Sequence, residues 1–242
     1  MENAVKFRKW ASSFSGCDGG DTGNPINKSK WVCGIEWGGG HDPEHLEKLI
    51  QFEELAPPKG YDSWQENLSY IFNWQVIKLL SVVEGKNLSN YKDFAELQRP
   101  FVEGSSGYFK MNLYPIAFKN TSHDLWQNKF ASVTGFERKN DYLEWCNVNR
   151  FPQIRKWVST YQPEIVICLG KTYKEEFKAA FSDPDVNFNT EYIDERELSW
   201  AKNTHGTLVL VIPFMVNRNG LIKNLSIEKF GIRIRELMSE NC

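Results

Sequence analysis

Four short apolar runs, separated by segments with helical periodicity, are the feature that most constrains the fold of this chain. The runs span residues 31–35, 108–113, 165–169 and 207–212. They are continuous rather than alternating, so each is expected to be a strand buried on both faces, as in parallel sheets covered by helices. The helical segments between them suit the crossovers that parallel strands require. The sequence therefore predicts an α/β fold of three layers, α/β/α, around a central four-stranded parallel sheet.

Helical periodicity and capping signals place the helices between these runs. The clearest helix is residues 63–83, where Ser63 and Glu66 form a capping box and Gly85 suits the position after the last turn. The other expected helices are residues 5–14, 43–54, 91–98, 124–136, 141–161 with an interruption at Pro152, 172–181 and 226–238. Residues 15–27 and 182–205 are expected to be loops. With 242 residues and no evident linker, residues 1–242 are expected to form a single domain.

The composition is that of an ordinary globular protein without a global affinity for nucleic acid. The formal net charge is -2, so any contact with nucleic acid needs a local basic patch. The five cysteines are scattered and form no C-x-x-C pair, which indicates reduced thiols rather than disulfides or a cluster site. No signal peptide or transmembrane run is visible. We therefore expect a cytoplasmic monomer that does not bind membranes.

Two groups of residues could contact a metal. His41 and His45 have a spacing that could hold a metal if both were helical, but His41 precedes the expected N-cap, Asp42. Asp18 and Asp21 lie in a loop rich in glycine and asparagine. They could contact a metal or a substrate, but acidic residues are also common in turns, which is the interpretation we favour. We expect neither a metal nor another cofactor.

The segment after the first apolar run is where the chemistry is expected. The run leads to Glu36, a glycine-rich turn at residues 38–40, and the helix start Asp42-Pro43. Such a turn offers backbone N–H groups to an anion, and Glu36 follows its strand at the end where open α/β sheets bind ligands. The loops after the other strands would bring Asn112 and residues 217–219 to the same edge. A carboxylate, an amide and basic groups together suit a nucleobase or nucleotide better than an apolar ligand.

The order of these motifs resembles the uracil-DNA glycosylase superfamily. The segment Gly34-Ile35-Glu36-Trp37-Gly38 is similar to the family's first motif, with Glu36 in the acidic, water-activating position and Trp37 in place of proline. The segment Asn112-Leu113-Tyr114-Pro115 is similar to the motif whose asparagine contacts the flipped base. The run ending in Gly170-Lys171 is similar to the third-strand segment. The last motif keeps Pro213 and the Arg-Asn pair, but Ile212 stands where the family has a histidine that stabilises the departing base.

The resemblance implies hydrolysis of the N-glycosidic bond of a flipped uracil or modified base in DNA. Glu36 would be the catalytic residue. The substrate-binding residues would be Trp37, Gly38, Asn112, Tyr114, Pro213, Asn217, Arg218 and Asn219. Phe214 and Met215 could form a wedge between base steps or continue the core. The partner would be DNA or a nucleotide-like ligand, and no cofactor would be needed.

Two other interpretations of the sequence remain open. Because Ile212 replaces the histidine, the chain could be a catalytically silent module that binds nucleic acid or a nucleotide on the same fold. It could also be a small-nucleotide hydrolase or sensor that uses residues 38–40 as a phosphate cradle. A complete P-loop, with Gly-Lys-Ser or Gly-Lys-Thr at the required spacing, is absent from the sequence.

Overall fold

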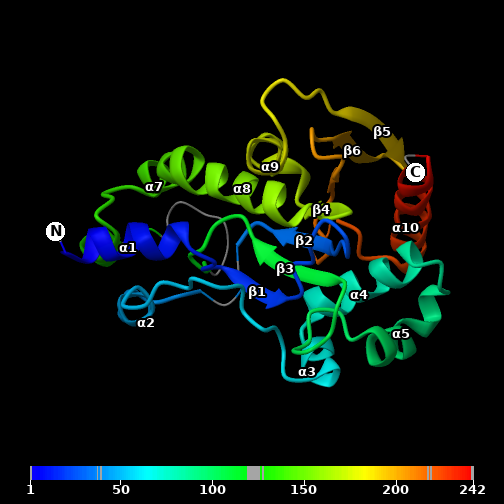
Figure 1. Ribbon diagram of the computed structural model, residues 1–242, viewed down its shortest axis with the longest axis horizontal. Helices are drawn as coiled ribbons and strands as arrows, with labels where there is room; N and C mark the ends of the chain where they lie inside the picture. The colour runs from blue at the N-terminus through cyan, green and yellow to red at the C-terminus, as the bar shows by residue number, and fades with distance from the viewer. Residues whose placement is uncertain are drawn as a thin grey trace.

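The fold is built on one mixed sheet with helices on both faces (Figure 1). The computed structural model describes residues 2–240 except 37, 39, 119–125, 127, 217 and 219. In this part of the chain, seven strands form the sheet in the order β1-β3-β2-β4-β7-β6-β5. The strands are β1 (Cys17–Gly20), β2 (Lys30–Gly34), β3 (Tyr108–Asn112), β4 (Ile165–Leu169), β5 (Asn189–Ile193), β6 (Arg196–Lys202) and β7 (Leu208–Ile212). The helices are α1 (Glu2–Ser12), α2 (Pro43–Leu49), α3 (Trp64–Ser69), α4 (Ile71–Val83), α5 (Tyr91–Gln98), α6 (Asn128–Thr134), α7 (Lys139–Trp145), α8 (Phe151–Tyr161), α9 (Lys174–Phe181) and α10 (Asn224–Ser239).

The α/β class is confirmed, but the expected four-stranded parallel sheet is wrong. The four apolar runs do form strands, and β3, β2, β4 and β7 pair in parallel at the centre of the sheet. An antiparallel strand, β1, extends one edge, and the antiparallel strands β6 and β5 extend the other. The central strands were recognisable because they are buried on both faces. The outer strands carry polar and glycine residues that are typical of turns.

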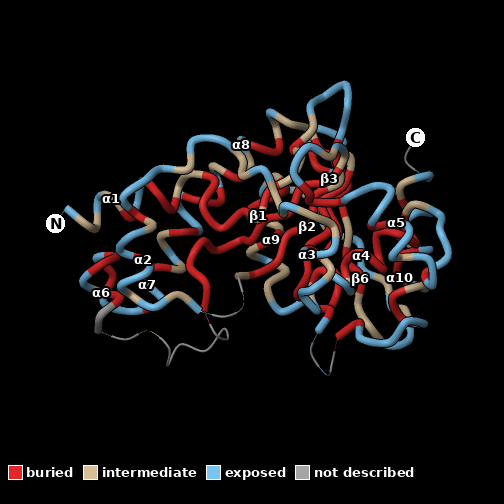
Figure 2. Tube along the Cα trace, turned by 90° about the horizontal axis from the view of Figure 1, so that it is seen from below, coloured by how far each residue is buried: buried red, intermediate tan, exposed pale blue. Residues whose placement is uncertain are grey.

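Alternate side chains of the central strands pack into two separate cores. On β4, Val166 and Cys168 belong to the core formed with α1, α8 and α9, whereas Ile165 and Ile167 belong to the core formed with α4 and α10. The same alternation holds on β2 and β7. Figure 2 shows the strands buried along their length between helices whose outer faces are exposed. This two-sided burial is the main driving force that holds the layers together.

The hairpin β5–β6 lies within the stretch expected to be a loop. Its turn consists of Asp194 and Glu195, which adopt φ angles of 47° and 64°. A two-residue hairpin turn requires such left-handed backbone and usually carries Asn-Gly or Asp-Gly. The strand β5 is also largely exposed, so its sequence lacks the apolar run that marks a buried strand. Neither signal was therefore present in the sequence.

The helix expected at residues 63–83 is two helices, α3 and α4. Ser63 caps α3 as predicted, because its side chain accepts a hydrogen bond from the backbone N–H of Glu66. Tyr70 then adopts an extended conformation (φ −90°, ψ 123°), which ends α3 and begins α4 in another direction. The buried Asn67 donates to the backbone oxygen of Pro100, while α4 packs against α10. The different packing partners of the two helices override the periodicity that continues through Tyr70.

The helix expected at residues 141–161 is also divided. The helices α7 and α8 are joined by a π-helical turn, residues Cys146–Arg150, and Pro152 lies in the first turn of α8, where its missing N–H costs no hydrogen bond. A π-helical turn adds a residue to the turn and re-aims the side chains that follow. The side chain of Arg150, at the end of this turn, is completely buried.

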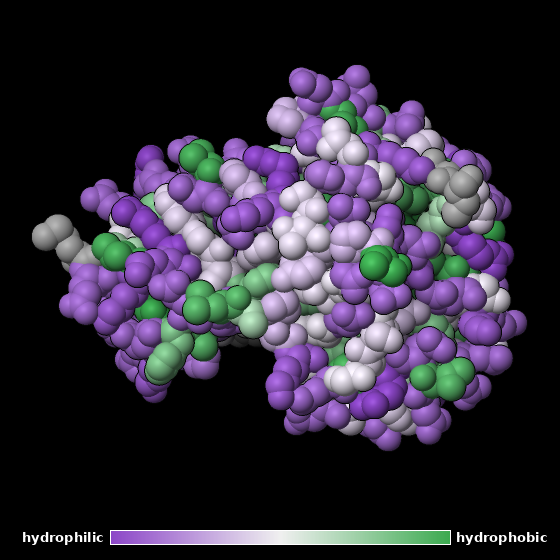
Figure 3. Space-filling view, viewed as in Figure 1, coloured by the Kyte–Doolittle hydropathy of each residue, from purple (hydrophilic) through white to green (hydrophobic). Residues whose placement is uncertain are grey.

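None of the described helices has the length and apolar character needed to cross a membrane. Figure 3 shows that the face seen in Figure 1 is mostly hydrophilic, with hydrophobic residues scattered in small groups.

Candidate functional site

A cleft of about 960 Å³ lies where β2 and β3 end, beside the junction of α3 and α4. It is on the face of the sheet that α4 covers, because Val32 of β2 packs into the α4 core and Gly34, two residues on, lines the cleft. The carboxyl ends of parallel strands are the usual ligand-binding edge of such sheets. The cleft therefore lies where the sequence predicted the chemistry.

The strand β3 contributes a lysine and an amide to the cleft. Phe109 and Met111 point into the opposite core, so Lys110 and Asn112 share the other face and line the cleft. The neighbouring strand β1 contributes Asp18, which lies at an irregularity in the pairing of β1 with β3. Such bulges re-aim a side chain and are common beside functional sites.

Asp18 is the centre of a buried hydrogen-bond network. Its Oδ1 atom accepts from the Tyr61 hydroxyl and from the Lys110 Nζ atom, both at 2.8 Å. Its Oδ2 atom accepts from the Nδ2 atom of Asn112 at 3.3 Å. The Lys110 ammonium also lies over the rings of Tyr61 and Phe72, at 5.6 and 5.2 Å from their centroids. Burial raises the pKa of Tyr61, and the nearby Asp18 carboxylate adds to this, so the phenol remains a donor.

The Asn112 amide is held in one orientation. Its Nδ2 atom donates to the backbone oxygen of Gly16 at 3.1 Å as well as to Asp18, and both partners are acceptors only. Its Oδ1 atom lies against Gly34, where a Cβ atom would be 2.5 Å away. Gly34 therefore makes room for the amide, and Asn112 presents an acceptor, not a donor, beside the cleft.

Arg150 holds the backbone near Asn112 in place through a set of buried hydrogen bonds. Its guanidinium donates to the backbone oxygens of Leu113 at 2.8 Å, Ala11 at 2.7 Å and Ser15 at 2.7 Å. A longer bond, at 3.3 Å, reaches the backbone oxygen of Asn112 itself. One buried side chain thus ties the segment before β1 to the end of β3.

Glu36 follows β2 and is buried at the edge of the cleft. Its side chain is only 6 % exposed, and its Oε1 atom has no hydrogen-bond partner among the described residues. Its Oε2 atom lies 3.8 Å from the Nζ atom of Lys139. Burial raises the pKa of Glu36 to about 7, although the Lys139 ammonium lowers it in part. A carboxyl group that is about half ionised near neutral pH can serve as a general base.

Replacing Lys139 with methionine is expected to raise the pKa of Glu36 further, by about one pH unit, because the favourable charge is lost and the burial remains. A carbon-13 NMR titration of the Glu36 carboxyl group measures this directly. The variant Lys139→Arg keeps the positive charge and serves as the control. An unchanged titration midpoint in the methionine variant would contradict the assigned contact.

His41 also lines the cleft, and its tautomer is fixed by the loop after β3. Its Nδ1 atom accepts from the backbone N–H of Ala117 at 3.2 Å, and the backbone N–H of His41 donates to the backbone oxygen of Ala117. Burial and the neighbouring His45 lower the pKa of His41 to about 4. The ring is therefore neutral at pH 7 with its proton on Nε2. In the described part of the chain, no three His, Cys, Asp or Glu side chains gather in a way that could hold a metal.

The remaining walls of the cleft come from α4 and the loop after β7. The Phe72 and Phe214 rings lie with their centroids 5.6 Å apart and provide apolar faces. Asn73 is 1 % exposed, and neither polar atom of its amide has a hydrogen-bond partner in the described structure. A flat ring could pack against the phenylalanines and bond with the amides.

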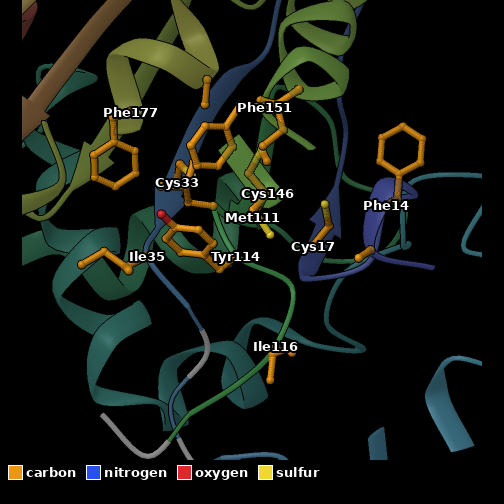
Figure 4. Close-up of a cluster of buried hydrophobic side chains, with 14 of the residues drawn as sticks. Phe14, Cys17, Cys33, Ile35, Met111, Tyr114, Ile116, Cys146, Phe151 and Phe177 are labelled. Carbon is orange, nitrogen blue, oxygen red and sulfur yellow. The ribbon is translucent and has the colours of Figure 1, made fainter. Parts of the chain in front are cut away.

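The structure brings some of the predicted residues into this cleft and places others elsewhere. Glu36, Gly38 and Asn112 line it. Tyr114 lies in the opposite core among Cys33, Met111 and Phe151, as Figure 4 shows. Pro213 is buried outside the cleft lining, and Arg218 is exposed and also outside it. Of the two residues considered as a wedge, Phe214 lines the cleft and Met215 is in the core. Trp37, Asn217 and Asn219 lie outside the described residues.

Sequence reasoning missed several polar residues of the cleft. For Lys110 and Asn73 a signal did exist: Lys110 stands between Phe109 and Met111 in an apolar run, and Asn73 stands one turn before Val76 and Ile77 on the apolar side of its helix. Asp18 had been assigned to a turn, and the turn role belongs instead to Asp21, whose carboxylate accepts from the backbone of Gly23 and Gly107. Tyr61 had no distinguishing signal.

Two comparisons of the sequence with known proteins found no match. No protein-family model matches the chain, and no curated protein matches its sequence. The function is therefore argued from the residues of the cleft.

Proposed function

We propose that the cleft binds a nucleobase and that the protein hydrolyses the N-glycosidic bond joining this base to its sugar in DNA. The observation that carries the proposal is Glu36, a buried carboxyl group with a pKa of about 7 and an unpartnered oxygen, in the same cleft as two asparagine amides. The amides can form hydrogen bonds with the edge of a base, and the Phe72 and Phe214 rings can pack against its faces. The carboxylate can stabilise the positive charge that develops on the sugar. The resemblance of the strand-end motifs to uracil-DNA glycosylases supports the same reaction.

In the proposed reaction, a water oxygen forms a bond to C1′ of the sugar while the bond from C1′ to the base nitrogen breaks. The electron pair of the broken bond leaves with the base. Glu36 accepts the proton of the water and stabilises the positive charge that develops on the sugar. The departing base is anionic, so a neutral donor near it favours its departure. Ile212 is apolar and cannot be this donor. His41, with its proton on Nε2, supplies a donor from the loop after β2 instead.

The alternative is that the protein binds the same ligand without cleaving it. Ile212 is completely buried, so the position at which the family carries its histidine contributes nothing to the cleft. If His41 does not act as the donor, binding remains and base release is lost.

A panel of oligonucleotides tests the proposal. Single- and double-stranded oligonucleotides that carry uracil, mismatched or modified bases are incubated with the protein and then treated with alkali, which cleaves the strand at abasic sites. We expect strand cleavage for at least one modified base. Binding that weakens with salt but yields no abasic site supports the silent module. If the protein neither binds nor cleaves any of these oligonucleotides, both functions are contradicted.

A further inference from the structure

The Asn73 amide is buried without a partner. It lies in the first turn of α4, immediately after the break at Tyr70, and it lines the cleft. Its side chain is 1 % exposed, and both its Nδ2 and Oδ1 atoms lack hydrogen bonds among the described residues. The Asn73 amide is close enough to the Tyr61 hydroxyl to lower in part the pKa of Tyr61, which burial raises, but this hydroxyl donates to Asp18, and neither amide atom of Asn73 has a hydrogen-bond partner among the described residues. A buried amide in this state destabilises the protein unless a ligand or water bonds with it.

The polar groups that β1, β3 and Tyr61 contribute to the cleft are already bonded to one another or to the backbone. Asn112 has its donor bound to Gly16 and Asp18, so it offers only an acceptor. Lys110 and Tyr61 both bond with Asp18. Of the two amides that line the cleft among the described residues, Asn73 is therefore the one with both a donor and an acceptor to offer.

From this contrast we infer that Asn73 is the specificity-determining residue for the ligand, and that the ligand is a flat ring with a hydrogen-bond donor next to an acceptor on one edge. This inference rests on the proposed function and narrows its substrate class. An asparagine amide pairs with such an edge through two parallel hydrogen bonds, as asparagine does with adenine. Bases in which methyl groups replace every N–H of this edge lack the donor, and the cleft is expected to discriminate against them.

The variant Asn73→Leu tests this inference because leucine has the same number of side-chain heavy atoms, branched at the same carbon, and no polar atoms. We expect its melting temperature to rise by about 2–6 °C, since the unpartnered amide is removed from the interior. We expect its affinity for the cognate base to fall by about 10- to 100-fold, since the ligand then loses both hydrogen bonds. A residue with a purely structural role would not show gain of stability together with loss of binding.

Asn67→Leu is the matched control. Asn67 is also a buried asparagine of this region, but it lies on α3, outside the cleft lining, and its Nδ2 atom donates to the backbone oxygen of Pro100 at 2.8 Å, so that only its Oδ1 atom lacks a partner among the described residues. We expect this substitution to lower the melting temperature and to leave the affinity for bases unchanged. Asn73→Ala provides a second test if the leucine variant does not fold.

The probes are 1-methyluracil, 1-methylcytosine and 9-methyladenine, in which this methyl group stands in for the sugar, and their counterparts with the edge N–H groups also methylated, 1,3-dimethyluracil, 1,N4,N4-trimethylcytosine and 9,N6,N6-trimethyladenine, with binding measured by calorimetry. For the base that binds the wild-type protein, methylation should lower the affinity by about 10-fold or more, and this difference should disappear in Asn73→Leu. Equal affinity for parent and methylated base, or unchanged binding by Asn73→Leu, overturns the inference and leaves the proposed function standing. If no base binds the wild-type protein although the oligonucleotide panel shows base release, the inference alone fails; if the panel also shows neither binding nor release, the proposed function fails with it.

Discussion

Replacement of Glu36 by glutamine is expected to lower the rate of base release by about 100- to 10,000-fold while the affinity for the base changes little. Glutamine has the same shape as glutamate but can neither accept the proton of the attacking water nor carry a negative charge opposite the sugar. The effect is large because the carboxyl group is almost completely buried, where a charge is poorly screened by water. Single-turnover release from the cognate oligonucleotide, followed by alkaline cleavage, measures the rate.

The pH dependence of the wild-type protein gives an independent measure of the same group. Because the pKa of Glu36 is about 7, the fraction of ionised carboxylate, and with it the rate, should rise between pH 6 and pH 8 and then level off. Glu44→Gln is the matched control, since Glu44 is an exposed carboxylate of α2 just beyond the same loop. Normal release by Glu36→Gln would rule out the catalytic role of this residue. Binding that is lost together with release would assign it to ligand binding instead.

Replacement of Arg150 by methionine is expected to lower the free energy of unfolding by about 3–5 kcal/mol. The side chain is completely buried, and its loss leaves the backbone oxygens of Ala11, Ser15 and Leu113 without donors in the interior. Methionine fills part of the space, and the cost of burying the guanidinium charge disappears, so the net loss is smaller than the sum of the bonds. Urea unfolding followed by tryptophan fluorescence measures the change.

Arg138→Met is the control for this prediction. Arg138 is an exposed arginine, 77 % accessible, that pairs with Asp141, and the loss of such a surface ion pair should cost less than about 1 kcal/mol. Arg150→Lys should be intermediate, because a lysine keeps the charge but lacks the fork of donors that reaches several oxygens at once. If Arg150→Met were as stable as the control, the bonds described for Arg150 would not be important for the fold.

The sequence predicted the centre of the fold well because burial on both faces leaves a clear pattern. The strand at residues 165–169 is an example, since each of its residues is apolar and each is buried. The strand β1 was missed because Cys17–Gly20 contains two glycines and an aspartate, and its pairing with β3 depends on residues about 90 positions away. Whether a segment at the edge of a sheet forms a strand depends on tertiary contacts of this kind more than on local propensity.

Part of the cleft lining could be predicted for a similar reason. Glu36 and Asn112 directly follow or end recognisable strands, so their convergence could be inferred from topology. The position of Asp18 depends on a bulge, and that of Asn73 on the break at Tyr70, and neither irregularity has a sequence pattern of its own. The residues that tune the cleft therefore lie where the regular elements are interrupted.

The bonds of Arg150 and Asp18 also determine when the cleft can form during synthesis. Asp18 is 92 residues from its partner Lys110, and Ala11 is 139 residues from Arg150. During synthesis, α1 and β1 leave the ribosome long before the residues that pack against them, so their apolar side chains stay exposed during this time. The cleft is therefore expected to form only after β3 and Arg150 have been synthesised.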